Sequence, residues 1–167
     1  NRLAALHFAK AQYAKAEALY RRALAVFQEV HGPDHEEVAV VLHNLAGVRF
    51  ARGDAIEAES MLRRALAIKG ERLGRAHPDT AMTLQNLGVV CAGVGRAAEA
   101  RRLLQRALAI FTKSLDSKHP KITLCRENLA ALDVSGPRSE ESAPSRKRAA
   151  AGSRVTTRRA ASNVQAA

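Results

Sequence analysis

The sequence predicts an all-α protein, an α-solenoid of antiparallel helix pairs with a disordered basic tail at the C-terminal end. Three observations predict this class. A set of residues recurs every 42 positions, each repeat contains two stretches of helical hydrophobic periodicity, and the last 34 residues lack the large apolar side chains of a core. We expect residues 1–133 to form the repeat array and residues 134–167 to form the tail.

The repeat is most visible in three segments that begin 42 residues apart. Residues 16–26 read AEALYRRALAV, residues 58–68 read AESMLRRALAI, and residues 100–110 read ARRLLQRALAI. A histidine and an Asn-Leu pair recur at the same spacing outside these segments. Agreement at so many positions indicates tandem duplication. The recurrent histidines and asparagines are His35, His77 and His119, and Asn44, Asn86 and Asn128.

Each unit divides into two predicted helices. The first spans residues 36–52 and ends at Gly53, and the second spans residues 55–73 and ends at Gly74. Small alanines in the second helix would let two helix axes approach closely. The predicted buried stripes are Val38, Val41, Leu42, Leu45 and Val48 in the first helix, and Ile56, Ala58, Ser60, Leu62, Ala65 and Leu66 in the second.

The small and large apolar positions of the two helices carry a family resemblance. They are Leu45, Ala46, Ala58, Leu62 and Ala65, followed 42 residues later by Leu87, Gly88, Ala100, Leu104 and Ala107. This pattern resembles the tetratricopeptide repeat. The phrases Asn-Leu-Ala, Arg-Arg-Ala-Leu-Ala-Ile and Gly-x-x-His-Pro-Asp resemble the lengthened repeats of kinesin light chains and nephrocystin-type proteins. The resemblance covers residues 1–133 and implies a right-handed solenoid that binds protein partners. The chain departs from the family where an aromatic residue is usual, at His7, Arg49 and Cys91.

The two ends of the array are expected to differ. Leu3 aligns with Leu45, so Asn1 is expected to lie inside an N-terminally truncated first helix of a protein with further repeats upstream. At the other end, residues 120–133 supply a first helix without a second, which suits a polar capping helix. The polar residues that suit such a cap are Lys121, Arg126 and Glu127.

The resemblance implies that the first helices line a concave groove in which an extended peptide binds. On a helical wheel, the free side of the first helix lies opposite the core stripe. Asparagine amides there can pair with a peptide backbone, and apolar neighbours offer pockets. The alternative is that these asparagines bridge neighbouring helices. The predicted groove residues are Val40, Asn44, Gly47, Met82, Asn86, Val89, Leu124 and Asn128.

Positive charge is expected to be sparse in this groove. The clamps of other tetratricopeptide proteins for chaperone tails need Lys or Arg where this chain has Val40, Met82 and Leu124. Only Arg2 and Arg126 are expected to bring positive charge nearby. The sequence therefore argues against that subtype of binding.

No set of residues predicts catalysis, a cofactor, a metal site or a small-molecule substrate. The three recurrent histidines are separated by at least a helix spacing of about 8–10 Å, whereas the ligands of one zinc ion lie about 2 Å from it. We therefore expect these histidines to start helices. Cys91 and Cys125 are expected to pack as small apolar residues. The chain contains no Walker loop, HExxH or nucleophile set, so an enzyme is not expected.

The tail is the second candidate site. Residues 134–167 hold seven Lys or Arg against two Glu, in a chain of formal net charge +11. Such a tail can contact nucleic acid or another polyanion weakly through charge alone. The basic residues singled out are Arg146, Lys147, Arg148, Arg158 and Arg159.

Two functions therefore compete. The first is a protein–protein interaction scaffold or adaptor that binds a peptide in its groove, in the manner of kinesin light chains with their cargo. The alternative is a basic-tail tether to a polyanion, with the repeats as a structural spacer. No apolar run is long enough to span a bilayer, and we expect a cytoplasmic protein, with nuclear or cytoskeleton-associated locations as alternatives.

Overall fold

Residues 1–134 are described by the structure, a computed structural model. The predicted tail, apart from Val134, lies outside the described residues, and so do all five of its singled-out basic residues. Within residues 1–134 the chain forms seven α-helices and no strand. The helices are α1 (Arg2–Ala9), α2 (Tyr13–His31), α3 (Glu36–Ala51), α4 (Ala55–Arg72), α5 (Pro78–Gly93), α6 (Ala97–Ser114) and α7 (Pro120–Val134).

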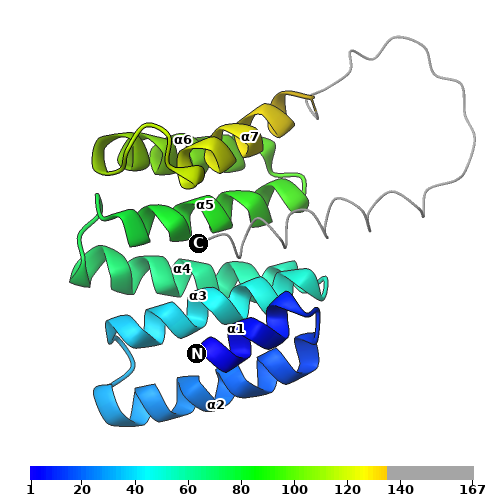
Figure 1. The fold of residues 1–167 in the computed structure, drawn as a ribbon, viewed down its shortest axis with the longest axis vertical. Helices are drawn as coiled ribbons and strands as arrows, with labels where there is room; N and C mark the ends of the chain where they lie inside the picture. Colours follow the sequence, from blue (N-terminus) through cyan, green and yellow to red (C-terminus); the bar gives the residue numbers. More distant parts are fainter. Residues whose placement is uncertain (135–167) are drawn as a thin grey trace, which may run out of the picture.

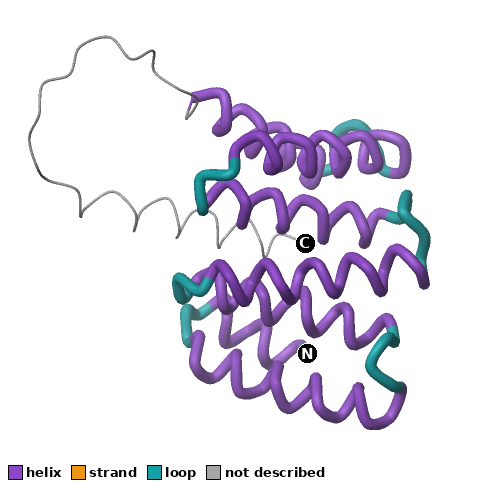
Figure 2. The backbone as a smooth tube through the Cα atoms, turned by 180° about the vertical axis from the view of Figure 1, so that it is seen from behind, coloured by secondary structure: helices purple, strands orange, loops and turns teal. Residues whose placement is uncertain are grey.

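The helices stack in chain order into an elongated array (Figure 1). Each helix packs mainly on the helices that precede and follow it in the sequence. Short loops join successive helices at alternating ends of the stack, so neighbours run antiparallel (Figure 2). This arrangement confirms the predicted all-α solenoid of helix pairs, and α7 is the last helix of the described range 1–134.

The predicted buried stripe of the first helix is confirmed. The predicted buried stripe of the second helix is confirmed only in part. Of the predicted stripe of α4, Ala58, Leu62 and Ala65 are buried, at the spacing of one helix face. Ile56 is 85% exposed and Ser60 is also exposed, so their predicted burial is wrong. Each lies two residues from Ala58, about 200° around the helix, and therefore points away from the core.

The recurrent histidines start helices, as predicted. In each unit the histidine Nδ1 accepts a hydrogen bond from the backbone N–H two residues later, which satisfies an amide that the first turn leaves unpaired. The pairs are His35 with Glu37 at 3.3 Å, His77 with Asp79 at 3.1 Å, and His119 with Lys121 at 3.2 Å.

The two ends of the described array differ in polarity. Leu3 and Leu6 on α1 are about half exposed, although their equivalents in α3 and α5 are buried. On α7, Arg126 and Glu127 are exposed at the positions that hold a buried leucine and a buried histidine in α3. The α7 end thus has the polar character expected of a capping helix.

At Gly88, α5 approaches α6 too closely for a larger residue, and we expect the replacement of Gly88 to destabilise the protein. A Cβ at Gly88 would lie 2.9 Å from Leu104 Cγ and 3.3 Å from the Ala100 carbonyl oxygen. Steric strain should outweigh the gain in helix propensity, so Gly88→Ala should lower the unfolding free energy by about 1 kcal/mol. Urea denaturation followed by circular dichroism measures this change.

Gly70 provides the matched control for that substitution. It lies inside α4, and a Cβ there would meet only Arg75 Cγ at 4.0 Å. Gly70→Ala should therefore raise the unfolding free energy by about 0.5–1 kcal/mol through helix propensity alone. Equal effects of the two substitutions would show that α5 and α6 do not pack as closely as described.

Candidate functional site

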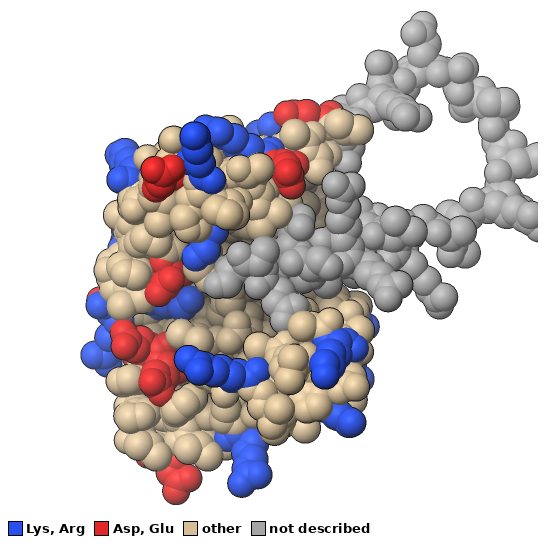
Figure 3. All heavy atoms as spheres, in the orientation of Figure 1, with Lys and Arg blue, Asp and Glu red and all other residues tan. Residues whose placement is uncertain are grey.

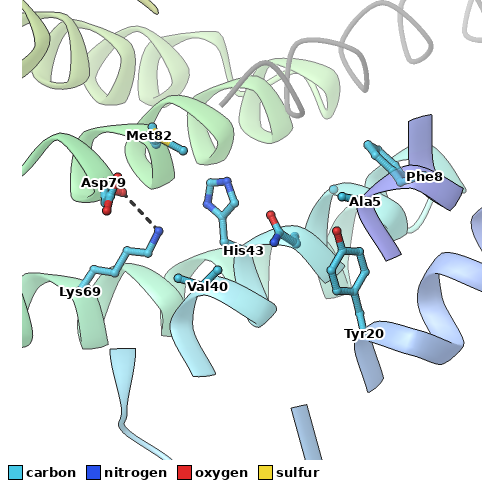
Figure 4. Close-up of a pocket in the computed structure, with 10 residues that line it drawn as sticks. Ala5, Phe8, Tyr20, Val40, His43, Lys69, Asp79 and Met82 are labelled. Atoms are coloured by element: carbon cyan, nitrogen blue, oxygen red, sulfur yellow. Dashed lines mark hydrogen bonds between the residues drawn. The ribbon is translucent and has the colours of Figure 1, made fainter. Parts of the chain in front are cut away.

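A hollow of about 360 Å³ lies among the first five helices, and we call it the central groove. Its floor is α3, and α1, α2, α4 and α5 supply its walls (Figure 4). Both apolar and polar side chains reach it, as in many binding sites. The residues that line it are Ala5, Phe8, Tyr20, Val40, His43, Asn44, Gly47, Lys69, Asp79 and Met82.

Half of the eight predicted groove residues border this hollow. Val40, Asn44 and Gly47 come from successive turns of α3, and Met82 comes from the facing turn of α5. Val40 is exposed, Asn44 and Met82 are partly exposed, and Gly47 is buried. The Asn44 side chain makes no hydrogen bond to any residue of the described range 1–134. Its amide therefore keeps both its donors and its acceptor for a ligand.

The other four predicted residues lie outside the central groove. On α5, Asn86 is 1% exposed and Val89 is also buried. On α7, Leu124 and Asn128 are partly exposed. Asn86 joins α5 to α3 by a hydrogen bond, which is the bridging role that the sequence left open as an alternative.

A chain of hydrogen bonds beneath the groove links α3 to α5. Asn86 Nδ2 donates to His43 Nε2 at 2.9 Å, so the ring proton lies on Nδ1. His43 Nδ1 then donates to Thr83 Oγ1 at 3.2 Å, and the Thr83 hydroxyl donates to the Asp79 carbonyl at 3.2 Å. The chain fixes the facing surfaces of two consecutive repeats.

His43 remains uncharged in this setting. Its burial, together with the nearby charges of Lys69 and Lys121, lowers its pKa to about 3. The sequence reasoning did not single out His43, although one signal was present. The equivalent positions in the next two units hold Gln85 and Glu127, so this side of the first helix is polar in every unit.

Lys69 brings a buried ammonium group to one end of the groove. Its side chain is 3% exposed, and Nζ donates to the Asp79 carbonyl at 3.4 Å (Figure 4). Burial lowers the pKa of Lys69; the Asp79 carboxylate opposes this shift and Lys121 adds to it. The equivalent residues in the flanking units are Phe27 and Phe111. A lysine at a repeat position that otherwise holds phenylalanine is the sequence feature that could have identified Lys69 as a functional residue.

A second ammonium group approaches the same end from α7. Lys121 Nζ donates to Met82 Sδ at 2.8 Å. The expectation that Arg2 and Arg126 alone bring positive charge to this face is therefore wrong. It missed Lys69 because it considered only the first helices, whereas Lys69 belongs to a second helix that reaches the groove between two repeats.

Outside the groove the surface charges are mixed and the two cysteine thiols are buried. Basic and acidic side chains are intermixed on the visible part of the face drawn in Figure 3. Cys91 and Cys125 are free and buried, as expected of packing residues. Burial raises the pKa of both thiols, to about 11 for Cys125, whose Sγ donates to the Leu104 carbonyl.

The described range contains neither a cluster of metal ligands nor a membrane-spanning helix. Among residues 1–134, no three His, Cys, Asp or Glu side chains gather as metal ligands would. None of the helices α1–α7 combines the length and apolar character needed to cross a membrane.

Comparison with known proteins identifies the repeats. The family model for the tetratricopeptide repeat matches residues 1–71, 37–113 and 79–143. No curated protein sequence matches the chain.

Two solved structures resemble the chain at 22% identity, and each match covers 98% of it. The first is BtubC (BKLC) from P. vanneervenii, with a TM-score of 0.72. The second is a Podosopora anserina protein assigned as a kinesin light chain with nearly identical TPR-like repeats, with a TM-score of 0.71. The matches cover 61% of the first protein and 82% of the second, so the chain spans about three fifths of BtubC.

Proposed function

Because the chain belongs to the tetratricopeptide repeat family, we propose that its central groove binds an extended peptide segment of a partner protein. The repeats of this family indicate a protein-interaction scaffold, and their fold is a non-catalytic one. The observation that carries the proposal is the Asn44 amide, which makes no hydrogen bond within residues 1–134 and lines the hollow together with two apolar side chains, Val40 and Met82.

This arrangement suits an extended backbone better than a compact ligand. An asparagine amide can donate to a peptide carbonyl and accept from a peptide N–H, which fixes the chain without regard to its side chains. Val40 and Met82 offer apolar contact on either side, and the flexible methionine adapts to different side-chain shapes. The volume of the groove falls within the usual range of ligand sites, about 300–1,000 Å³.

We further propose that peptide binding makes the chain an adaptor, which joins a partner to a larger assembly as a kinesin light chain joins cargo. The similarity to two kinesin light chain-like repeat structures supports this role. The 42-residue repeat length of the chain supports it as well. An adaptor of this kind would act in the cytoplasm.

Selection from a library of random twelve-residue peptides displayed on phage tests the groove. The full chain is the bait at raised salt, which suppresses contacts made through charge alone. We expect the enriched peptides to lose at least about tenfold in affinity for a Val40→Ser/Asn44→Ala variant, which removes one apolar and one polar contact.

A matched variant separates the groove from the rest of the surface. Val30→Ser/Gln105→Ala removes an exposed valine and an exposed amide on α2 and α6, away from the groove. This variant should bind the peptides as the natural chain does, and circular dichroism should show equal helix content in all three proteins. Peptides that bind the groove variant equally well would contradict the proposal. Binding that disappears only as salt rises would favour the tail as a polyanion tether.

A further inference from the structure

We propose that the central groove selects peptides in which an acidic side chain binds Lys69 and an apolar side chain two residues away contacts Phe8 and Tyr20. This inference rests on the peptide binding proposed above and specifies the chemistry of the partner. It follows from the two ends of the groove, which differ in character, and from the distance between them.

Within the described residues, no anionic group pairs directly with the charge at the basic end of the groove. Lys69 Nζ has three donors and uses one for the Asp79 carbonyl, and no carboxylate of residues 1–134 lies within ion-pair distance of it. The Asp79 carboxylate is half exposed and lies 3.9 Å from the His77 ring instead. A buried ammonium without a paired anion is unfavourable, so a carboxylate that enters the groove gains a strong partner.

Lys121 adds to the attraction at this end. Its ammonium lies against Met82, which borders the groove, and its charge is felt at both Lys69 and His43. Because His43 stays neutral, two ammonium groups face one carboxylate, that of Asp79. The balance at this end is one positive charge, which favours one acidic side chain of the ligand.

The opposite end is apolar with one polar group. Phe8 on α1 and Tyr20 on α2 line it, and both side chains are buried. Tyr20 directs its hydroxyl toward the groove and makes no hydrogen bond to another residue in the range 1–134 (Figure 4). An apolar ligand side chain can therefore pack on the rings while the hydroxyl donates to a peptide carbonyl.

The length of the groove sets the spacing of the two ligand groups. Val40 and Gly47 mark its extent along α3, and seven residues of helix span about 10 Å. An extended peptide advances about 3.3 Å per residue, so two residues that are two positions apart are separated by about 6.6 Å and fit within this length. Side chains two residues apart point to the same side of an extended chain. The expected pattern is therefore Asp or Glu, any residue, and then an apolar residue, read in either direction.

The phage selection described above tests this pattern when its sequences are compared between three baits. The natural chain and Lys113→Met, which removes an exposed lysine from α6, should enrich acidic residues two positions from Leu, Ile, Met or Phe. Lys69→Met keeps the apolar stem of the side chain and should lose the acidic preference alone. An enriched peptide and its Glu→Gln counterpart should differ about tenfold in affinity for the natural chain and less than about twofold for Lys69→Met.

Each other outcome overturns the inference in a distinguishable way. An acidic preference that survives in Lys69→Met would place the carboxylate elsewhere. Peptides that depend on Val40 and Asn44 but show no acidic preference would overturn this inference and leave the proposed function standing. Failure to enrich any groove-dependent peptide would overturn both. The Glu→Gln comparison on the natural chain needs no folded variant, so the inference stays testable even if Lys69→Met loses helix content.

Discussion

Acidification from about pH 7.5 to about pH 5 should lower the unfolding free energy by about 2 kcal/mol through His43 alone. The pKa of His43 is about 3 in the folded protein and 6.5 ordinarily, because burial and the charges of Lys69 and Lys121 disfavour its protonation. Below pH 6.5 the unfolded chain binds a proton that the folded chain does not. The contribution of His43 to the unfolding free energy is therefore fully present above about pH 6.5, and it is lost progressively as the pH falls toward about 3.

A His43→Gln variant isolates this contribution. Glutamine occupies the equivalent buried position 85 in the next repeat, so the local shape accepts it. Urea denaturation of both proteins at the two pH values gives the difference, because the other titrating groups are common to both. These include the groups that face His43 from neighbouring helices, Lys69, Asp79 and Lys121. An equal loss of stability in the two proteins would show that His43 is not held neutral in the folded state.

The fold was predictable because its information is periodic in the sequence. The 42-residue repeat located every helix pair, and the predicted helices 36–52 and 55–73 correspond to α3 (Glu36–Ala51) and α4 (Ala55–Arg72). The error at Ile56 shows where a hydrophobicity argument fails. An isoleucine is apolar wherever it lies, but its burial depends on its angle around the helix, and Ile56 lies about 200° from the alanine that packs.

The groove was less predictable because its chemistry depends on contacts between repeats. Val40 and Asn44 could be placed from the helical wheel of one helix. The bond from His43 to Asn86 joins residues 43 positions apart, and the approach of Lys69 to Asp79 depends on how α4 meets α5. Such residues can be found in the sequence where one repeat departs from the others at an equivalent position. Lys69 is an example, because both flanking units have phenylalanine there.

The departure from the family at Arg49 also has a structural cause. Glu17 on the preceding helix α2 accepts from Arg21, Arg49 and Arg52, and its side chain is 5% exposed. Arg49 thus occupies the position of the family's aromatic residue and pairs with a buried acid. At the last interface the equivalent pair has the opposite polarity, because Arg101 on α6 contacts Asp133 on α7 at 2.5 Å.

Removal of these two equivalent side chains should therefore have unequal effects. Glu17→Ala should lower the unfolding free energy by about 2–3 kcal/mol, because it deletes a buried acceptor of charged hydrogen bonds and leaves basic groups at the α2–α3 interface without it. Arg101→Ala should cost at most about 1 kcal/mol, since the Arg101 and Asp133 side chains are 40% and 64% exposed and water replaces the contact.

A conservative variant and a change in salt concentration further distinguish the buried Glu17 cluster from the exposed Arg101 pair. Glu17→Gln keeps the shape and one acceptor oxygen, so it should lose less stability than Glu17→Ala. Raised salt should weaken the exposed Arg101 pair far more than the buried Glu17 cluster, because bulk ions screen only charges that water reaches. Thermal and urea denaturation of the three variants at low and high salt measure these differences. Equal losses of unfolding free energy for Glu17→Ala and Arg101→Ala would mean that burial does not make the Glu17 cluster stronger than the Arg101 pair. Arg49 would then replace the family's aromatic residue only through the packing of its aliphatic stem.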